Sequence, residues 1–169
     1  GAGGGGIVPW ATLSGYDTQD QISVSAALSQ ADLADYRLNV QAISASFYDR
    51  IEISLAHQRL DLKTLGGDIK MNIIGAKYKL YGDAVYSSLP QISVGVQHKT
   101  LEDKAIANAL SANDTSGTDF YLAATKIHLG AIGGYNAVWN ITARASKANE
   151  LGLLGFGGQN NDNYELMLE

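Results

Sequence analysis

The amino-acid sequence predicts an all-β fold, an antiparallel up-and-down sheet that forms a transmembrane β-barrel. Two observations lead to this prediction. About nine segments alternate apolar and polar residues with a period of two, which places one set on each face of a strand. Their connections switch regularly between short and long, so short turns would gather at one rim and long loops at the other. The whole chain, residues 1–169, is expected to form a single β-barrel domain.

The composition agrees with strands in a membrane. Nineteen glycines, together with short runs of β-branched and aromatic residues, favour strands over helices. Charged residues make up 17% of the chain, against roughly 25% in soluble domains. No stretch approaches the roughly 20 apolar residues of a membrane-spanning helix, so a membrane protein of this sequence would span as strands. The net charge of −5 argues against a nucleic-acid partner, and the lack of cysteine excludes disulfides and thiolate metal sites.

The expected strands follow one another along the chain. They cover residues 8–16, 22–28, 36–47, 51–62, 69–80, 91–97, 118–127, 139–146 and 164–169. Connections near 17–20, 48–50, 81–90 and 129–136 are mostly short, whereas those near 29–35, 61–68, 100–117 and 148–162 include the two longest. The first strand would therefore start at the long-loop rim. Single-chain bacterial barrels instead begin in the periplasm, at the short-turn rim, and have an even number of strands. An odd count of about nine predicts part of a larger barrel, with strands missing at both ends.

The hairpin over residues 36–62 allows its register to be predicted. A tight turn at Asp49 would pair residues whose numbers sum to about 98, which places Phe47 opposite Ile51. Near this turn the apolar residues occupy odd positions, whereas farther along both strands they occupy even positions. The apolar residues of strand 69–80 also switch from odd to even positions along the strand. Either the wall leaves the bilayer partway up, which we favour, or matched bulges shift the pleat.

Charged residues in the same region predict cross-strand pairs. Keeping apolar residues beside apolar ones places Glu52 opposite Lys79. The same register sets Asp61 between Arg37 and Lys70.

Aromatic residues gather near both expected rims, as they do in the girdles of transmembrane barrels. Those near the short-turn rim are Tyr16, Phe47, Tyr48, Tyr78, Tyr81, Tyr86, Tyr135 and Trp139. Those near the long-loop rim are Tyr36, Phe120, Tyr121, Phe156 and Tyr164.

No catalytic, cofactor-binding or metal-binding residues are predicted. His57, His98 and His128 lie on different expected strands without a second ligand at metal spacing. Ser54 precedes His57 by an odd number of residues, which puts the two on opposite faces of a strand and argues against a Ser-His pair. We therefore expect no enzyme activity, although a barrel hydrolase remains an alternative. The polar residues expected to face the lumen are Arg37, Glu52, Asp61, Lys70, Lys77, Arg144 and Glu165.

Three segments carry a resemblance to a known family. Residues 3–11 (GGGGIVPWA), 35–38 (DYRL) and 47–62 (FYDRIEISLAHQRLDL) are similar to a proteobacterial family catalogued as a domain of unknown function. Its members are expected to be outer-membrane β-barrels. The resemblance spans nearly the whole chain, but its motifs are structural, so it implies no activity and no functional residues.

The leading hypothesis is thus a bacterial outer-membrane β-barrel in contact with outer-membrane lipid, acting as a pore or passive channel. A second is a non-conducting scaffold that holds another envelope protein, or a second copy of itself, through loops 100–117 and 148–162. A third is a soluble lipocalin-like barrel that binds a ligand with an apolar inner face. Alternation alone does not distinguish an inward from an outward apolar face.

Overall fold

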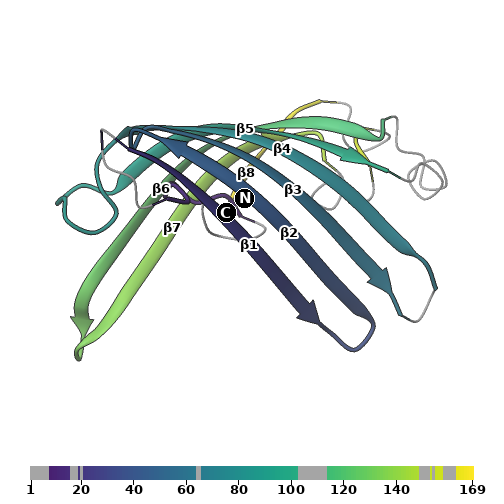
Figure 1. Cartoon of the computed structure of the whole chain (residues 1–169), viewed down its shortest axis with the longest axis horizontal. Helices are drawn as coiled ribbons and strands as arrows, with labels where there is room; N and C mark the ends of the chain where they lie inside the picture. Colours follow the sequence, from purple (N-terminus) through teal and green to yellow (C-terminus); the bar gives the residue numbers. More distant parts are fainter. Residues whose placement is uncertain are drawn as a thin grey trace.

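The computed structural model describes residues 8–15, 19, 21–63, 66–102, 114–148, 153, 155–157 and 163–169. These residues form one antiparallel sheet of eight strands, ordered in space as in the chain (Figure 1). The strands are β1 (Ile22–Asp32), β2 (Tyr36–Phe47), β3 (Ile51–Leu62), β4 (Asp68–Tyr81), β5 (Gln91–Leu101), β6 (Ser116–Ile132), β7 (Tyr135–Ser146) and β8 (Glu165–Leu168). The described residues form no helix able to cross a membrane. The predicted all-β, up-and-down antiparallel arrangement is confirmed.

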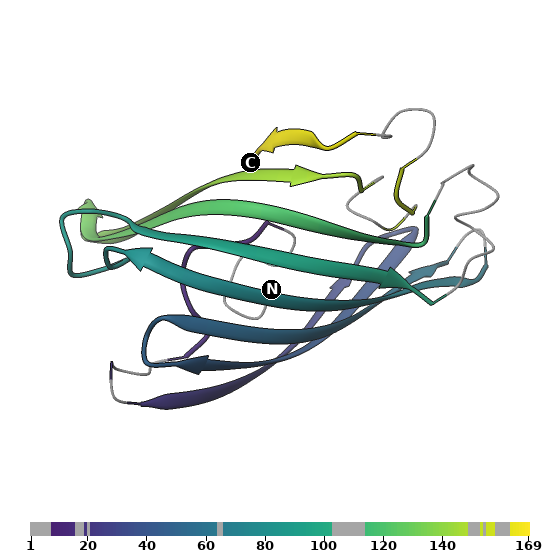
Figure 2. The same ribbon diagram turned by 90° about the horizontal axis from the view of Figure 1, so that it is seen from above.

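The sheet is strongly curved and not closed. Figures 1 and 2 show the sheet bent into an open arch with a concave and a convex face. Within the described residues, β1 pairs with β2 and β8 pairs with β7, so these two strands form the edges of the sheet.

The predicted strand over residues 8–16 is wrong. Residues 8–15 form no strand, and residue 16 lies outside the described part of the chain. Figure 2 shows this segment crossing the hollow of the curved sheet. Pro9 lacks the N–H that a strand ladder needs, and its carbonyl accepts a side-chain hydrogen bond from Thr142 Oγ1 at 2.7 Å. The sheet therefore has eight strands rather than the nine expected. We call residues 8–15 the strap.

The connections alternate between the two rims as predicted. Those at 48–50, 82–90 and 133–134 lie at the short-turn rim, and those at 33–35, 63–67, 102–115 and 147–164 lie at the long-loop rim. β6 and β7 are longer than the predicted 118–127 and 139–146, because Gly133 and Gly134 (φ 56° and 88°) let them meet in a tight hairpin turn.

The predicted register of the first hairpin is confirmed, but that of the next is wrong. Phe47 lies opposite Ile51, as expected. Glu52, however, lies opposite Lys77 instead of Lys79, and Asp61 lies opposite Asp68. The cause is the tight turn at 62–67, in which Leu62 N–H donates to the carbonyl of Gly67 at 3.0 Å, so that pairing resumes at Asp68. Because the error is an even number of residues, it leaves the assignment of faces unchanged.

On β2 to β4 the two faces exchange their chemistry along the strands, whereas on β5 to β7 the concave face stays largely polar toward the long-loop end, where Lys99, Asp119 and Ser146 are buried. In the half near the short-turn rim, the convex face exposes apolar side chains such as Val24, Ile53 and Ile141, while the concave face buries polar ones such as Ser93 and Thr125. In the half near the long-loop rim, a concave cluster of Ile69, Met71 and Leu101 packs with Leu60 and Leu62. The registers of β2 with β3 and of β3 with β4 are uninterrupted, so matched bulges do not explain the exchange.

Candidate functional site: the concave face and the strap

The strap starts against β7 and crosses to the middle of the sheet. The Pro9 carbonyl accepts hydrogen bonds from Thr142 Oγ1 at 2.7 Å and, more weakly, from Asn140 Nδ2 at 3.4 Å, both on β7. The Ala11 N–H donates to Thr125 Oγ1 on β6 at 2.8 Å. Pro9 and Ala11 are buried.

From Ala11 the strap continues over β5, β4 and β3. The Ala11 carbonyl accepts hydrogen bonds from Gln91 Nε2 at 2.8 Å and Ser93 Oγ at 2.6 Å, both on β5. The Thr12 carbonyl accepts one from Lys77 Nζ on β4 at 2.6 Å. The Ser14 N–H donates to Glu52 Oε2 on β3 at 2.6 Å.

Ser14 completes the crossing at β2 and β1. Its carbonyl accepts a hydrogen bond from Ser25 Oγ on β1 at 2.7 Å, and its hydroxyl accepts one from Ser44 Oγ on β2 at 2.5 Å. The strap is thus attached to each strand from β1 to β7. A segment that crosses strands cannot form a backbone ladder, so the side chains of the sheet satisfy its backbone groups instead.

A buried ion pair lies beneath the strap. Glu52 Oε1 and Lys77 Nζ are 3.5 Å apart, and the two residues are only 2% and 6% exposed. Buried charges are tolerated when they are paired and further hydrogen-bonded. Here the strap supplies those further bonds, since each member of the pair also binds one of its backbone groups.

A second charged cluster lies on the concave face of β5 to β7. Lys99 Nζ is 2.6 Å from Asp119 Oδ2, and the Ser146 hydroxyl donates to the other Asp119 oxygen. Beside them Arg144, 1% exposed, forms an ion pair with Glu169. Away from the apolar cluster of Ile69, Met71 and Leu101, the concave face is therefore polar and mixed in charge.

The structure places the residues expected to face the lumen on both faces of the sheet. Glu52, Lys77 and Arg144 are buried on the concave face, and Glu165 lies on the same face opposite Ser146. Arg37, Asp61 and Lys70 lie on the convex face near the long-loop rim, and none of the three forms the expected ion pair with another.

Residues that sequence reasoning did not single out make most contacts to the strap. Gln91, Ser93, Thr125 and Thr142 are neutral polar residues at the inward positions of their strands. Their alternation with apolar residues was the only signal in the sequence that pointed to them.

A comparison with protein families identifies the chain. A family model described as "Protein of unknown function (DUF3034)" matches residues 1–169. The chain belongs to the DUF3034 family. No curated protein and no solved structure matches it.

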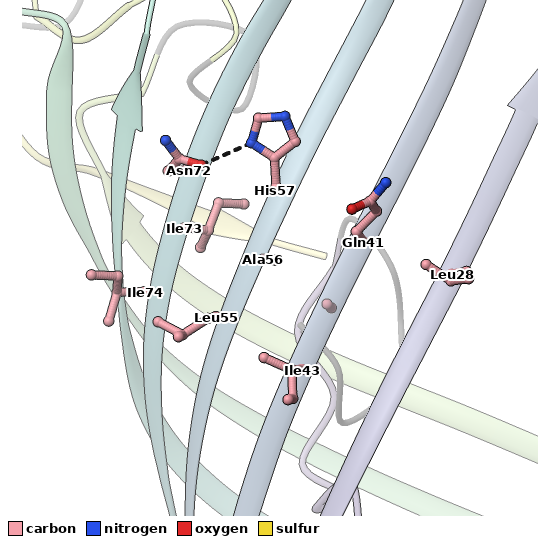
Figure 3. A pocket seen from close by; sticks show the side chains of 10 residues that line it. Leu28, Gln41, Ile43, Leu55, Ala56, His57, Asn72, Ile73 and Ile74 are labelled. Atoms are coloured by element: carbon pink, nitrogen blue, oxygen red, sulfur yellow. Dashed lines mark hydrogen bonds between the residues drawn. The ribbon is translucent and has the colours of Figure 1, made fainter.

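On the convex face of the DUF3034 chain, an open hollow of about 510 Å³ lies across β1 to β4 (Figure 3). Two parallel rows of side chains cross it. The row nearer the long-loop rim consists of the polar residues Gln41, His57 and Asn72, and the other row consists of the apolar residues Ile43, Leu55 and Ile74. Within the polar row, a hydrogen bond of 2.8 Å joins His57 Nδ1 and Asn72 Oδ1. The hollow is thus a boundary between polar and apolar surface.

The three histidines lie on the convex face of different strands, each beside a polar or aromatic partner. His57 binds Asn72, His98 Nδ1 is 2.9 Å from Thr118 Oγ1, and His128 Nε2 accepts from Trp139 at 3.1 Å. Ser54 and His57 fall on opposite faces of β3, as predicted. In the described part of the chain, no three His, Asp or Glu side chains gather to hold a metal ion.

The connection 82–90 contains a carboxylate that organises its turn. Asp83 Oδ1 accepts hydrogen bonds from the N–H groups of Val85 at 2.7 Å and Tyr86 at 2.6 Å. Burial raises the pKa of Asp83, but these backbone donors, with Lys79 and Lys126, hold the pKa below its ordinary value.

Proposed function

We propose that this DUF3034 protein is a bacterial outer-membrane β-barrel protein whose polar concave face lines a pore or passive channel. The observation that carries the proposal is the inverted distribution of side chains near the short-turn rim. Val24 and Ile53 are 69% and 49% exposed on the convex face, whereas Lys77 and Arg144 are 6% and 1% exposed on the concave face. Water favours the opposite arrangement, and a lipid-facing wall around a polar interior favours this one.

The return to an ordinary arrangement near the long-loop rim supports the same proposal. There the apolar cluster of Ile69, Met71 and Leu101 faces inward and the charged pairs Arg59–Asp61 and Lys70–Asp68 face outward. This part of the sheet has a polar convex face, as expected for a surface in contact with water. One sheet with both arrangements is expected where strands leave the bilayer and continue into solvent.

Most exposed aromatic residues fit the two girdles that this position requires. Tyr48, Tyr81 and Tyr135 are 52%, 51% and 79% exposed near the short-turn rim. Near the other rim, Phe120 is exposed on the convex face, whereas Tyr36 is exposed on the concave face, opposite Leu62, and does not fit a girdle. Of the other expected members, Tyr78, Tyr86, Trp139 and Tyr164 are exposed and Phe47 is half-buried. Tyr121 and Phe156 are 6% and 2% exposed, so their assignment to a girdle is wrong, and Tyr16 lies outside the described residues.

The two competing functions have less support. A soluble lipocalin-like barrel needs an apolar inner face, and the half of the sheet that holds the strap buries polar side chains there instead. A scaffold that binds a partner through its long loops is compatible with the same wall. It differs from the channel in conducting no ions.

Tryptophan fluorescence tests the membrane location, because the chain has two tryptophans in different settings. Trp139 is 38% exposed on the convex face, whereas Trp10 is half-buried in the strap. In vesicles of phospholipid brominated near the headgroup, we expect quenching of Trp139 in the Trp10→Phe variant and none of Trp10 in the Trp139→Phe variant. Equal emission from Trp139 with and without bromine would overturn the proposal, as would recovery of the protein in the soluble fraction without detergent.

Conductance separates the channel from the scaffold. The purified protein in planar bilayers is expected to carry a small ion current. Protein that inserts, as reported by Trp139 quenching, but never conducts would leave the scaffold as the function.

A further inference from the structure

We propose that the strap is the gate of this channel: bound to the concave face it closes the interior, and released it opens it. The inference rests on the proposed channel function. Its first support is position, since the strap runs from Thr142 on β7 to Ser25 on β1, across the polar half of the sheet. Figure 2 shows it crossing the concave side of the curved sheet.

The sheet does not need the strap for its own pairing. Each strand from β1 to β7 is paired in register with its neighbour, and in the described part of the chain no backbone–backbone hydrogen bond joins the strap to a strand. Every attachment given above involves a side chain of the sheet. Release would therefore break these side-chain bonds and leave the strand ladders whole.

The concave surface that the strap would uncover on release can be hydrated. Ser25, Ser93, Thr125 and Thr142 are hydroxyl residues that can exchange their bond to the strap for one to water. Lys77 and Glu52 would keep each other as partners at 3.5 Å. An apolar surface would hold the strap by the hydrophobic effect, whereas this polar surface offers water hydrogen-bond partners when the strap leaves it.

A disulfide can lock the gate in its closed state. The Oγ atoms of Ser14 and Ser44 are 2.5 Å apart, and the chain has no cysteine, so the Ser14→Cys/Ser44→Cys variant can form only this one bridge within the chain. We expect the oxidised variant to conduct less than the wild type, and reduction to restore the wild-type current in the same bilayer. The reduced protein is its own control for folding.

A second variant favours release. Ser93→Ala/Thr142→Val removes one donor to the Ala11 carbonyl and the nearer donor to the Pro9 carbonyl without changing any charge, and leaves Gln91 and Asn140 in place. Two lost hydrogen bonds should raise the released fraction roughly 5- to 30-fold, and the open probability with it. Ser54→Ala is the matched control, because Ser54 lies on the concave face of β3 and has no hydrogen bond to the described strap.

Trp10 reports the strap independently of current. In the Trp139→Phe background, release should expose Trp10 and increase its quenching by acrylamide in the Ser93→Ala/Thr142→Val variant, but not in Ser54→Ala. Increased quenching without increased current would overturn the gate, and so would an unchanged current in the oxidised lock. If Trp139 senses brominated lipid and no variant conducts, the channel function itself fails, while an unquenched Trp139 rejects the membrane location.

Discussion

Breaking the buried ion pair between Glu52 and Lys77 is the most direct test of the concave face. In the Glu52→Gln variant, the Lys77 ammonium, 6% exposed in the wild type, loses its counter-charge and keeps only neutral acceptors such as the Thr12 carbonyl. Removing one member of a buried pair costs about 3–5 kcal/mol, because it leaves an uncompensated charge. The Asp68→Asn variant is the control, since Asp68 pairs with Arg59 at 2.9 Å and Lys70 at 3.4 Å through partly exposed side chains, and each such pair contributes at most about 1 kcal/mol.

Urea unfolding in phospholipid vesicles, followed by tryptophan fluorescence, measures both free energies. The double variant Glu52→Gln/Lys77→Met should recover part of the stability lost in Glu52→Gln, because it removes the stranded charge. A loss below about 1 kcal/mol in Glu52→Gln, matching Asp68→Asn, would refute the reasoning. It would mean that water reaches Lys77 and that the strap does not seal the pair.

Three further predictions concern the wall and its turns. Ile53→Arg should lower the stability in vesicles by about 2–4 kcal/mol, whereas Gln41→Arg, in the polar row of the same face, should cost at most about 1 kcal/mol; equal costs would contradict a lipid boundary. Gly95→Ala should destabilise by about 1–3 kcal/mol because the new Cβ would overlap the Tyr121 ring, and Tyr121→Leu should relieve this in the double variant. Because the folded pKa of Asp83 is lowered, its contribution is present above 3.8 and lost as pH falls through that lower pKa, so Asp83→Ala should flatten the acid branch of stability against pH.

Much of the sheet could be predicted from the sequence because its signals are local. The period of two in 51–62 fixes which residues share a face, and the short turn at Asp49 fixes the register with β2. The register of β4 was missed because a shift of two residues keeps apolar residues beside apolar ones and leaves Glu52 opposite a lysine, while opposite charges around Asp61 favoured Lys70 over the observed partner, Asp68. Gly66 and Gly67, both with positive φ, decide it by tightening the turn.

The strap could not be predicted for a different reason. Residues 8–14 contain enough apolar residues to resemble a strand, and nothing local shows that their backbone partners are side chains far along the chain. Thr142 is separated from Pro9 by 133 residues, and Ser93 from Ala11 by 82. Pro9 was the one local warning, since proline is confined to the edges and ends of strands.

The line between the apolar and polar parts of the convex surface supports the proposed membrane location. On β2, β3 and β4 this line falls between the same two rows of paired residues, the polar row that contains Gln41 and the apolar row that contains Ile43. On β1 the apolar side extends one row farther, to Leu28, which pairs with Gln41. On β5 it stops one row sooner, at Val96, because His98 pairs with Ile74.

The boundary therefore crosses the strands obliquely, and the direction of the step is the same from β1 to β5. Strands of a transmembrane barrel tilt by roughly 35–45° from the barrel axis, so a flat membrane surface must cut them at successive rows. A contact between protein copies would follow the outline of the partner and would have no reason to move by one row in a constant sense. The steps at Leu28 and Val96 have the constant sense that the proposed membrane location predicts for tilted strands, although β2 to β4 share one row.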